Sequence, residues 1–411
     1  MTLPVVSVLF DFSNGPIFGY SFTLGDAAHG ILGTDRLGDN ANDIVDISDQ
    51  VGKISIRRGY NLLQDQWQAG TASVRVYDPT GAWNPQNPAS PYFGKLIPLR
   101  KMRIAGDGYF LFSGYTTGYS YTYPKDMEIG FVDIELSDGF RLLSMANVTT
   151  VTGATAGQDT GTRINKILDA VSFPTSMRNV DTGGTETTVQ ADPGTARTSL
   201  QAIKNIEFCE QGAAYFAPSG NFEFKSRAYV MSKSGQNPTD FANDGSGIGY
   251  KNIVFAFDDK LIINQANMTR AGGSVQNAFN TTSIDKYFPH SINYSDLMVQ
   301  TDAQALDIAK IYVATRAETT IRIDAITLDL NATDAAGDTA ALTLDFFDTI
   351  AIKNVAQDGT IIEKTLQCMG VIHEITPSTW NTTFTTSEPI VDGFLLNSTL
   401  YGILGTSVLS Y

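Results

Sequence analysis

The chain has 411 residues, of which 42% are hydrophobic, and this length allows about two to four domains with hydrophobic cores. The formal net charge of −15 argues against a protein that grips nucleic acid through a basic surface, because neutralisation of phosphates by Lys and Arg dominates that affinity. The two cysteines, Cys209 and Cys368, lie far apart and lack metal-ligand spacing, so we expect two buried thiols rather than a disulfide.

The acidic charge is unevenly distributed. Residues 1–52 carry a net charge of −6, residues 53–150 carry +2, and the remainder carries −11. The N-terminus, MTLPVVSVLFDFSN, has no basic leader, and no apolar run approaches the roughly 18 residues that a membrane helix needs. We therefore expect neither a secretion signal nor stable membrane insertion.

The first clear strand lies at residues 71–77, where Ala72, Val74 and Val76 alternate with polar side chains. The sequence Asp-Pro-Thr-Gly at 78–81 predicts a tight turn. Prolines at 85, 88, 91 and 98 hold the residues before them extended and remove backbone donors. Residues 84–97 are therefore predicted to form an ordered crossing loop rather than a central strand.

A hairpin follows the crossing loop. Residues 99–104 resume as a strand, Gly106-Asp107-Gly108 turns the chain, and residues 109–115 return. Apolar alternation then reappears at Val132, Ile134 and Leu136. This pattern predicts at least four short antiparallel strands, as in a small barrel or sandwich.

A basic cluster, Lys95, Arg100, Lys101 and Arg103, lies in this region. One interpretation is a solvated face that protects a sheet edge; the other is a surface that meets an acidic patch on a partner.

Three later segments, residues 163–173, 195–209 and 301–316, have apolar side chains at helical spacing, and Thr301 is a suitable N-cap for the last. We expect all three helices to pack on sheets rather than bind cofactors. No cofactor is predicted.

Strands return between and after these helices. Residues 214–216 and 222–224 flank a Pro-Ser-Gly-Asn turn. The alternation in residues 321–330 slips once, at Ala325-Ile326, which indicates a bulge. Residues 342–352, 361–375 and 379–386 are predicted to complete a second β module, whereas residues 231–250 have the composition of a long exposed loop.

The two ends of the chain carry the same short motif. FTLGDAAHGILGTDRL occupies residues 22–37 and FLLNSTLYGILGTSVL occupies residues 394–409, with Phe-x-Leu and Gly-Ile-Leu-Gly-Thr in register. Two copies are too few for a solenoid, so we interpret each copy as an apolar clip. The clips pack either on the β-barrels of this chain or on equivalent neighbouring subunits, and both alternatives remain open.

The search for chemistry is mostly negative. His29, His290 and His373 are far apart in sequence, and His373-Glu374 lacks the second histidine of a zinc-protease helix. We expect His373 to be a core or interface residue. The glycine-rich run at 245–249 lacks the Lys-Ser or Lys-Thr of a phosphate loop and is predicted to be an ordinary loop.

Acidic residues also give no defined site. Asp39, Asp43 and Asp46 miss the calcium-loop spacing and are better interpreted as a solvated acidic arm. A glycosidase needs two carboxylates held across a cleft, and no such pair can be nominated among the 43 acids. No metal site and no catalytic residue is therefore predicted.

The run AGTASVRVYDPTGAWNPQNPASPYFGKLIPLRKMRI resembles the N-terminal barrel of bacteriophage tail hub proteins, often called minor tail proteins. LFSGYTTGYSY and VDIELSDGFRLL resemble the strands that follow it, and GTRINKILDAV and SLQAIKNIEFCEQGAAYFAPSGNFEFKSR are similar to the middle domain of the family. VIHEITPSTWNTTFTTSE is similar to its closing strands. The similarity extends over most of residues 50–390, although Asn84 stands where the family usually has an acidic residue.

The resemblance implies a homotrimer in which each chain supplies two similar β-barrels, giving a ring that approximates six-fold symmetry. Such a ring would meet a hexameric distal tail ring or tail tube on one side and a central fibre or spike on the other. It would surround the channel through which the tape measure protein and then phage DNA leave, and a negative lumen would keep DNA from adhering. The implied location is the tail tip of the virion, after assembly in the host cytoplasm.

The predicted fold is mainly β with α+β insertions: two small antiparallel β-barrels, a helix-containing middle domain and extended terminal arms. The predicted divisions are an N-terminal arm at 1–47, a first barrel at 48–150, a middle domain at 151–230, a second barrel at 231–386 and a C-terminal arm at 387–411. The predicted interface residues are Phe22, Leu24, Ile31, Leu32, Phe394, Leu396, Ile403, Leu404, Arg100 and Arg103.

Two other functions remain open. A tail protein that binds a host surface glycan could use the tyrosines at 119, 121 and 123 as a platform, although alternation also predicts an exposed strand face. A cell-wall hydrolase is the weaker alternative because no acid, base or metal constellation can be named. The leading hypothesis is a structural, non-enzymatic hub.

Overall fold

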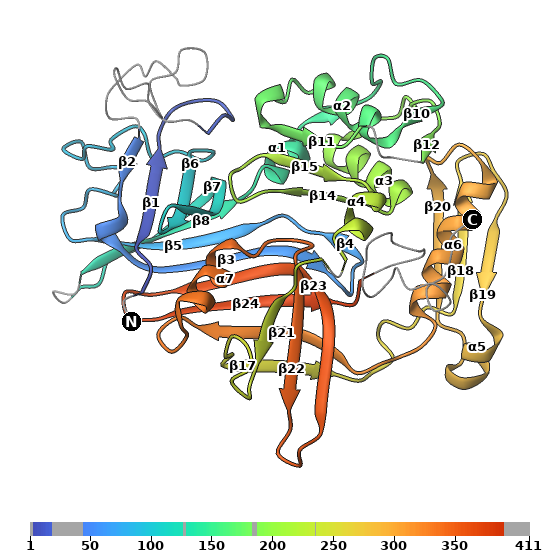
Figure 1. Cartoon of the computed structure of the whole chain (residues 1–411). Helices are drawn as coiled ribbons and strands as arrows, with labels where there is room; N and C mark the ends of the chain where they lie inside the picture. Colours follow the sequence, from blue (N-terminus) through green and yellow to red (C-terminus); the bar gives the residue numbers. More distant parts are fainter. Residues whose placement is uncertain (1–2, 19–43, 126–128, 183–186, 235, 390–411) are drawn as a thin grey trace.

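A computed structural model describes residues 3–18, 44–125, 129–182, 187–234 and 236–389. The fold is mainly β and is dominated by one large sheet, with two smaller α/β lobes beside it (Figure 1). Most of the strand pairs in the large sheet are antiparallel, with β16–β22 as a parallel exception.

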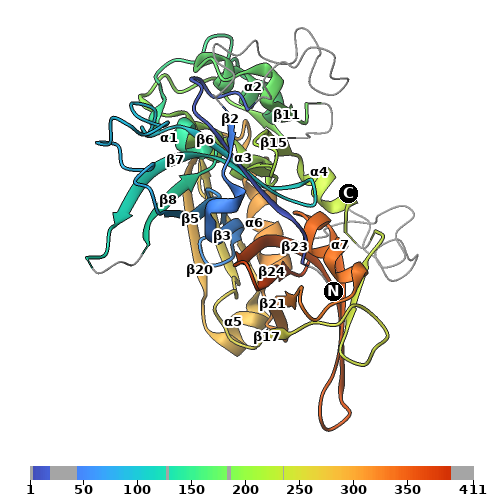
Figure 2. The same ribbon diagram turned by 90° about the vertical axis from the view of Figure 1, so that its left-hand side faces the viewer.

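The first β module contains the strands of residues 6–137. Their order in the sheet is β3-β5-β8-β7-β6-β1-β2, with β4 paired to β3. Its elements are β1 (Val6–Asp11), β2 (Ile44–Asp46), the 3-10 helix η1 (Ser48–Gln50), β3 (Val51–Asn61), β4 (Gln66–Trp67), β5 (Thr71–Asp78), β6 (Lys101–Gly106), β7 (Tyr109–Thr122) and β8 (Gly130–Ser137). The β7–β8 hairpin extends away from the body (Figure 2).

The sequence pattern explains why these strands form. Ala72, Val74 and Val76 of β5 are all buried, which confirms the predicted strand. The crossing loop is also ordered: Trp83 is fully buried, its ring packs on Phe10 with centroids 5.7 Å apart, and its Nε1 donates to Gln50 Oε1 at 2.9 Å. Burial of this large ring fixes the loop over the core, as the prolines predict.

The second β module is formed by strands from the C-terminal part of the chain and joins the first module edge to edge. Its elements are β16 (Thr239–Ala242), β17 (Asn252–Ala256), β21 (Arg322–Asp329), α7 (Ala335–Thr343), β22 (Thr349–Val355), β23 (Ile361–Ile375) and β24 (Trp380–Ser387). The long strand β23 pairs antiparallel with β3, from Gly370 opposite Gly59 to Ile375 opposite Ile54. The two modules therefore share one 14-stranded sheet and one hydrophobic core.

No closed barrel is found among the described strands, because the main path through the sheet ends at β17 and β2. Close approach at the joint between the modules requires glycine. Gly59 has a φ of +144°, and a Cβ there would lie 2.5 Å from the Cα of Gly370. Side chains at this position would separate β3 from β23.

The middle lobe, residues 140–232, supplies the predicted α+β part. Its elements are α1 (Phe140–Met145), β9 (Asn147–Val148), β10 (Gln158–Asp159), α2 (Thr160–Ala170), the 3-10 helix η2 (Thr175–Met177), β11 (Arg178–Val180), β12 (Thr188–Val189), β13 (Arg197–Thr198), α3 (Ser199–Glu210), β14 (Ala213–Phe216), β15 (Phe222–Lys225) and α4 (Arg227–Ser232). The helices predicted at 163–173 and 195–209 are confirmed with shifted bounds, as α2 and α3. α3 begins at a capping box between Thr198 and Gln201.

The outer lobe, residues 263–316, is an excursion from the second β module. It contains β18 (Gln265–Arg270), β19 (Gln276–Phe279), α5 (Thr281–Tyr287), β20 (Ser291–Leu297) and α6 (Asp302–Arg316). The predicted cap Thr301 accepts a hydrogen bond from the backbone N–H of Gln304. Ile308 and Val313 of α6 join the hydrophobic core of the middle lobe, so the two lobes pack side by side (Figure 1).

Several local predictions need correction. Residues 342–352 are not one strand, because Leu342 and Thr343 end α7 and β22 begins at Thr349. Residues 231–250 are not entirely an exposed loop, because β16 pairs parallel with β22 and buries Phe241. The predicted bulge in β21 is present, but the extra residue is Asp324, next to Ala325.

Candidate functional site

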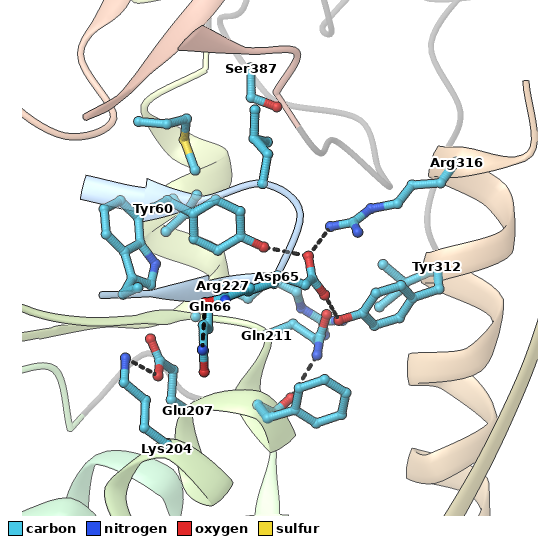
Figure 3. A pocket seen from close by; sticks show the side chains of 18 of the residues that line it. Tyr60, Asp65, Gln66, Lys204, Glu207, Gln211, Arg227, Tyr312, Arg316 and Ser387 are labelled. Atoms are coloured by element: carbon cyan, nitrogen blue, oxygen red, sulfur yellow. Dashed lines mark hydrogen bonds and ion pairs between the residues drawn. The ribbon is translucent and has the colours of Figure 1, made fainter. Parts of the chain in front are cut away.

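A cavity of about 370 Å³ lies where the large sheet, the middle lobe and the outer lobe meet (Figure 3). We call it the junction cavity. Its walls come from the β3–β4 hairpin, from α3 and α4, from β20 and α6, and from the end of β24. Cavities at the meeting point of separate structural units are the usual location of binding sites.

The β3–β4 hairpin carries the acidic group of the cavity. Asn61 Oδ1 accepts hydrogen bonds from the backbone N–H groups of Leu63 and Gln64, at 3.0 and 3.1 Å, and this side-chain-capped turn sets the shape of the loop. Asp65 follows with a φ of 53°, a left-handed conformation that Asp tolerates better than most residues. The turn thus directs the Asp65 carboxylate toward α6 (Figure 3).

Helix α6 presents two partners to this carboxylate. Tyr312 and Arg316 are four residues apart and so lie on one helix face. Arg316 Nη2 pairs with Asp65 Oδ1 at 2.5 Å, and the hydroxyls of Tyr312 and Tyr60 both donate to Asp65. Three donors converge on a carboxylate whose side chain is only 13% exposed. We call these four residues the Asp65 cluster.

The Asp65 cluster has fixed protonation states near neutral pH. Burial by itself would raise the pKa of Asp65, but the Arg316 charge and the hydrogen bonds from Tyr312 and Tyr60 outweigh it and lower that pKa. Burial, together with the Asp65 charge, raises the pKa of both tyrosines above the usual range. Asp65 is therefore ionised and bonded to three donors, which leaves it poorly suited to act as a general base.

The opposite wall comes from the middle lobe. On α3, Lys204 Nζ pairs with Glu207 Oε2 at 2.8 Å, and Glu207 Oε1 accepts from the backbone N–H of Ala214 at 2.8 Å. Phe208 packs on Tyr294 of β20 with ring centroids 4.3 Å apart. The Phe208–Tyr294 contact joins the middle lobe to the outer lobe, whereas the Glu207 contacts lie within the middle lobe.

The rest of the lining is largely aromatic and aliphatic. Trp67 of β4 packs on Phe346 with ring centroids 4.8 Å apart and on Tyr215 at 5.4 Å. The apolar lining residues are Leu62, Trp67, Phe208, Val230, Met231, Leu297, Ile311, Phe347 and Met369. The cavity is therefore a largely apolar hollow, and the Asp65–Arg316 and Lys204–Glu207 ion pairs lie in its walls.

The predicted interface residues fall into two groups. Phe22, Leu24, Ile31, Leu32, Phe394, Leu396, Ile403 and Leu404 lie outside the described residues. Arg100 and Arg103 are described and half-buried: Arg100 Nη1 donates to Asn14 Oδ1 at 2.8 Å, and the Arg103 guanidinium lies 4.7 Å from the centre of the Phe110 ring. Their part in an interface stays a proposal.

The basic cluster is not one surface. Lys101 is fully buried, and its Nζ pairs with Asp11 at 2.9 Å and donates to the backbone carbonyl of Ile17 at 2.9 Å. The solvated interpretation is therefore wrong for this residue. A lysine at this position anchors the segment after β1 rather than protecting an edge.

The two cysteines and His373, which were singled out in the sequence, are buried in the core. Cys209 and Cys368 are both free and buried, as predicted. His373 is buried in β23, its Nδ1 lies 3.0 Å from Thr382 Oγ1, and burial lowers its pKa to about 3. It is a core histidine, as predicted. Among the described residues, no three His, Cys, Asp or Glu side chains are placed to hold a metal ion.

The tyrosine row on β7 is a ladder of side chains. Tyr119 and Tyr121 stack with ring centroids 6.4 Å apart, and so do Tyr121 and Tyr123. The Tyr119 hydroxyl donates to the carbonyl of Ile97 at 3.1 Å and the Tyr123 hydroxyl to Asp78 at 3.0 Å. Two of the three hydroxyls are thus used in contacts with the crossing loop and the turn before it.

The Asp65 cluster is absent from the sequence-based predictions. Tyr312 and Arg316 could have been recognised as an i, i+4 pair on the helix predicted at 301–316. Asp65 is 251 positions away from Arg316, and nothing in the local pattern indicates that the β3–β4 hairpin meets α6. In the part of the chain that the structure describes, no helix is long and apolar enough to cross a membrane.

No family model matches the sequence, and no curated protein matches it. Solved structures are similar. A tail protein from Neisseria meningitidis MC58 superposes with a TM-score of 0.58 at 11% identity, covering 95% of this chain and 98% of that one. The prophage MuSo2 43 kDa tail protein from Shewanella oneidensis gives 0.56 at 11% identity, covering 84% of this chain and 96% of that one.

The prophage tail protein gp18 from Listeria monocytogenes EGD-e gives a TM-score of 0.51 at 10% identity, covering 94% of this chain and 95% of that one. Identities this low support a shared fold and nothing finer. Over most of its length, the chain has the fold of these tail proteins.

Proposed function

We propose that this chain is a structural hub protein of a bacteriophage tail tip or baseplate. The observation that carries the proposal is the agreement in fold with tail proteins along nearly the whole chain, at 95% coverage of this chain and 98% of the Neisseria protein. A shared fold does not by itself define a function. The proposal therefore also relies on the resemblance of the sequence to hub proteins and on the architecture of the sheet.

The proposed assembly is a homotrimer in which the two β modules of each chain act as barrel-like halves of a ring. Pairing of β3 with β23 makes the two modules one continuous sheet, which suits the wall of a ring around a channel. This ring would join the distal tail ring or tail tube to a central fibre or spike, and the tape measure protein and phage DNA would pass through it. The net charge of −15 would disfavour adhesion of DNA.

The proposed contact residues are those of the two terminal clips, together with Arg100 and Arg103. The clips would supply apolar contacts on the barrels of this chain or of neighbouring subunits, and the two arginines would meet an acidic partner surface. An obligate interface of this kind should bury more than about 2,000 Å². The protein would act in the virion, at the tail tip, after assembly in the host cytoplasm.

Host-glycan binding remains the second candidate, and its motivating observation is the tyrosine ladder on β7. Two of its hydroxyls are engaged within the chain, which reduces the number of polar groups available to a sugar. A cell-wall hydrolase is the weaker alternative. In the junction cavity the Asp65 carboxylate is ionised and bonded to three donors, and Glu207 is bonded to Lys204 and to the backbone N–H of Ala214.

The test is the assembly state of the purified full chain. Size-exclusion chromatography with light scattering should give a trimer, and negative-stain images should show a three-fold ring with a central hole. A monodisperse monomer that also binds host glycans would favour the second candidate, a glycan-binding tail protein. Clearing of purified peptidoglycan in a zymogram would overturn the structural proposal in favour of the hydrolase.

A further inference from the structure

The junction cavity lies at the point where the described chain ends. Ser387, the last residue of β24, and Glu388 both line the cavity, and the described residues stop at Pro389. The next 22 residues of the sequence, 390–411, therefore start beside this apolar hollow. They include the C-terminal clip.

The composition of residues 390–411 matches the lining of the cavity. Asp392 is the only Asp, Glu, Lys or Arg in this stretch, and the C-terminal clip, residues 394–409, has none. Its large apolar side chains are Phe394, Leu395, Leu396, Leu400, Tyr401, Ile403, Leu404, Val408 and Leu409. Such side chains gain most from transfer into an apolar, aromatic-lined hollow.

The electrostatics of the cavity also favour a neutral occupant. Asp65 is paired with Arg316, Lys204 with Glu207 at 2.8 Å, and Glu388 with Lys364 at 2.5 Å. Because these charges are matched within the chain, an ionic ligand would have to compete with existing pairs. A neutral apolar segment would leave all of them in place.

We propose that the junction cavity is the docking site for the C-terminal clip of the same chain, with Phe394 and Leu396 as the anchoring side chains. Phe394 lies six positions after Glu388, and a fully extended chain of that length spans up to about 20 Å, so the segment can turn back into the cavity beside which it starts. The short tether also gives the segment a high effective concentration at its own cavity, in the millimolar range for short flexible linkers. Docking within one chain is then favoured over docking on another copy in dilute solution.

This docking would place one segment in contact with the sheet, the middle lobe and the outer lobe at once. It does not rest on the proposed hub function, because the occupant is part of the chain itself. The two clips would then have separate roles that can be tested. The N-terminal clip follows Phe18, whose ring packs on Tyr115 of the first β module with ring centroids 5.3 Å apart.

The experiment uses full-length protein and a fluorescent peptide with the sequence of residues 392–406. In wild-type protein the cavity is already occupied, so fluorescence anisotropy should show at least about tenfold weaker peptide binding than in the variant Phe394→Asp/Leu396→Asp. The variant should bind the peptide with one-to-one stoichiometry. A matched variant in the other clip, Phe22→Asp/Leu24→Asp, should behave like wild type.

Binding must also depend on the cavity walls. In the Phe394→Asp/Leu396→Asp background, Asn205→Trp on α3 fills the hollow from one side and Ser387→Trp from another. Each should abolish peptide binding, and circular dichroism identifies any variant that fails to fold. A peptide of scrambled sequence should not bind.

Three outcomes would overturn the proposal. Equal peptide binding by wild type and the aspartate variant would show that the own-chain clip does not occupy the cavity. Binding that survives both tryptophan substitutions would place the clip elsewhere. A wild-type dimer that becomes monomeric in the Phe394→Asp/Leu396→Asp variant would assign the occupant to a second copy. The first two outcomes do not depend on whether the chain forms a trimeric ring.

Discussion

Replacing Asp65 by Asn should loosen the contact between the outer lobe and the large sheet. Asp65 and Arg316 have side chains that are only 13% and 19% exposed, and Asp65 accepts hydrogen bonds from three donors. Asn has one acceptor oxygen and no charge, so Arg316 would be left buried beside a neutral group. Breaking a buried ion pair on one side costs about 3–5 kcal/mol.

The sharper measurement is a double-mutant cycle of Asp65→Asn and Arg316→Met. The appropriate quantity is the free energy of local opening of α6, obtained from amide hydrogen exchange, because the lobes of a chain this size can open separately. Coupling of about 2–3 kcal/mol between the two substitutions is expected for residues in direct contact in one network.

The matched control is Lys286–Glu318, an ion pair at 2.7 Å whose side chains are 56% and 49% exposed. Its double-mutant cycle should show no measurable coupling, since solvent screens such a pair. Additive effects of Asp65→Asn and Arg316→Met on α6 would refute the reasoning, because the pair would then not hold the outer lobe to the sheet.

Three further predictions concern stability. Burial raises the pKa of Asp138 to about 7, so the folded state binds its proton more tightly than the unfolded state does. The free energy of unfolding should therefore fall by about 3 kcal/mol as pH rises from 4 to 7. Asp138→Asn should flatten this slope in urea unfolding. Burial lowers the pKa of His373 to about 3. The free energy of unfolding should therefore fall by about 5 kcal/mol as pH falls from 6.5 to below 3. A His373→Asn protein that loses stability equally over that range would contradict this prediction. Gly59→Ala should lower the free energy of unfolding by about 1–3 kcal/mol, because the φ of Gly59 is +144° and a Cβ there would clash with Gly370. The control is Gly118→Ala, whose Cβ would meet nothing within 4 Å. It should leave the thermal denaturation nearly unchanged.

Local patterns determined much of the secondary structure of this protein. Two-residue alternation places Val74 and Val76 in the core, and the prolines of residues 85–98 hold a crossing loop that buries Trp83. Thr301 starts α6 because its side chain satisfies a free backbone donor of the first turn. These features depend on neighbours within a few positions, so the sequence carries them directly.

Other features were decided only by contacts between distant segments. Leu342 lies in an alternating apolar stretch but ends α7, and Phe241 lies in a polar segment but forms a strand because β22 is there to pair with it. The junction cavity depends on the β3–β4 hairpin meeting α6, which brings Asp65 to Arg316 across 251 positions. Periodicity records which face of an element is apolar and not which other element covers that face, and for this reason the sequence alone could predict the strands and helices but not the cavity between them.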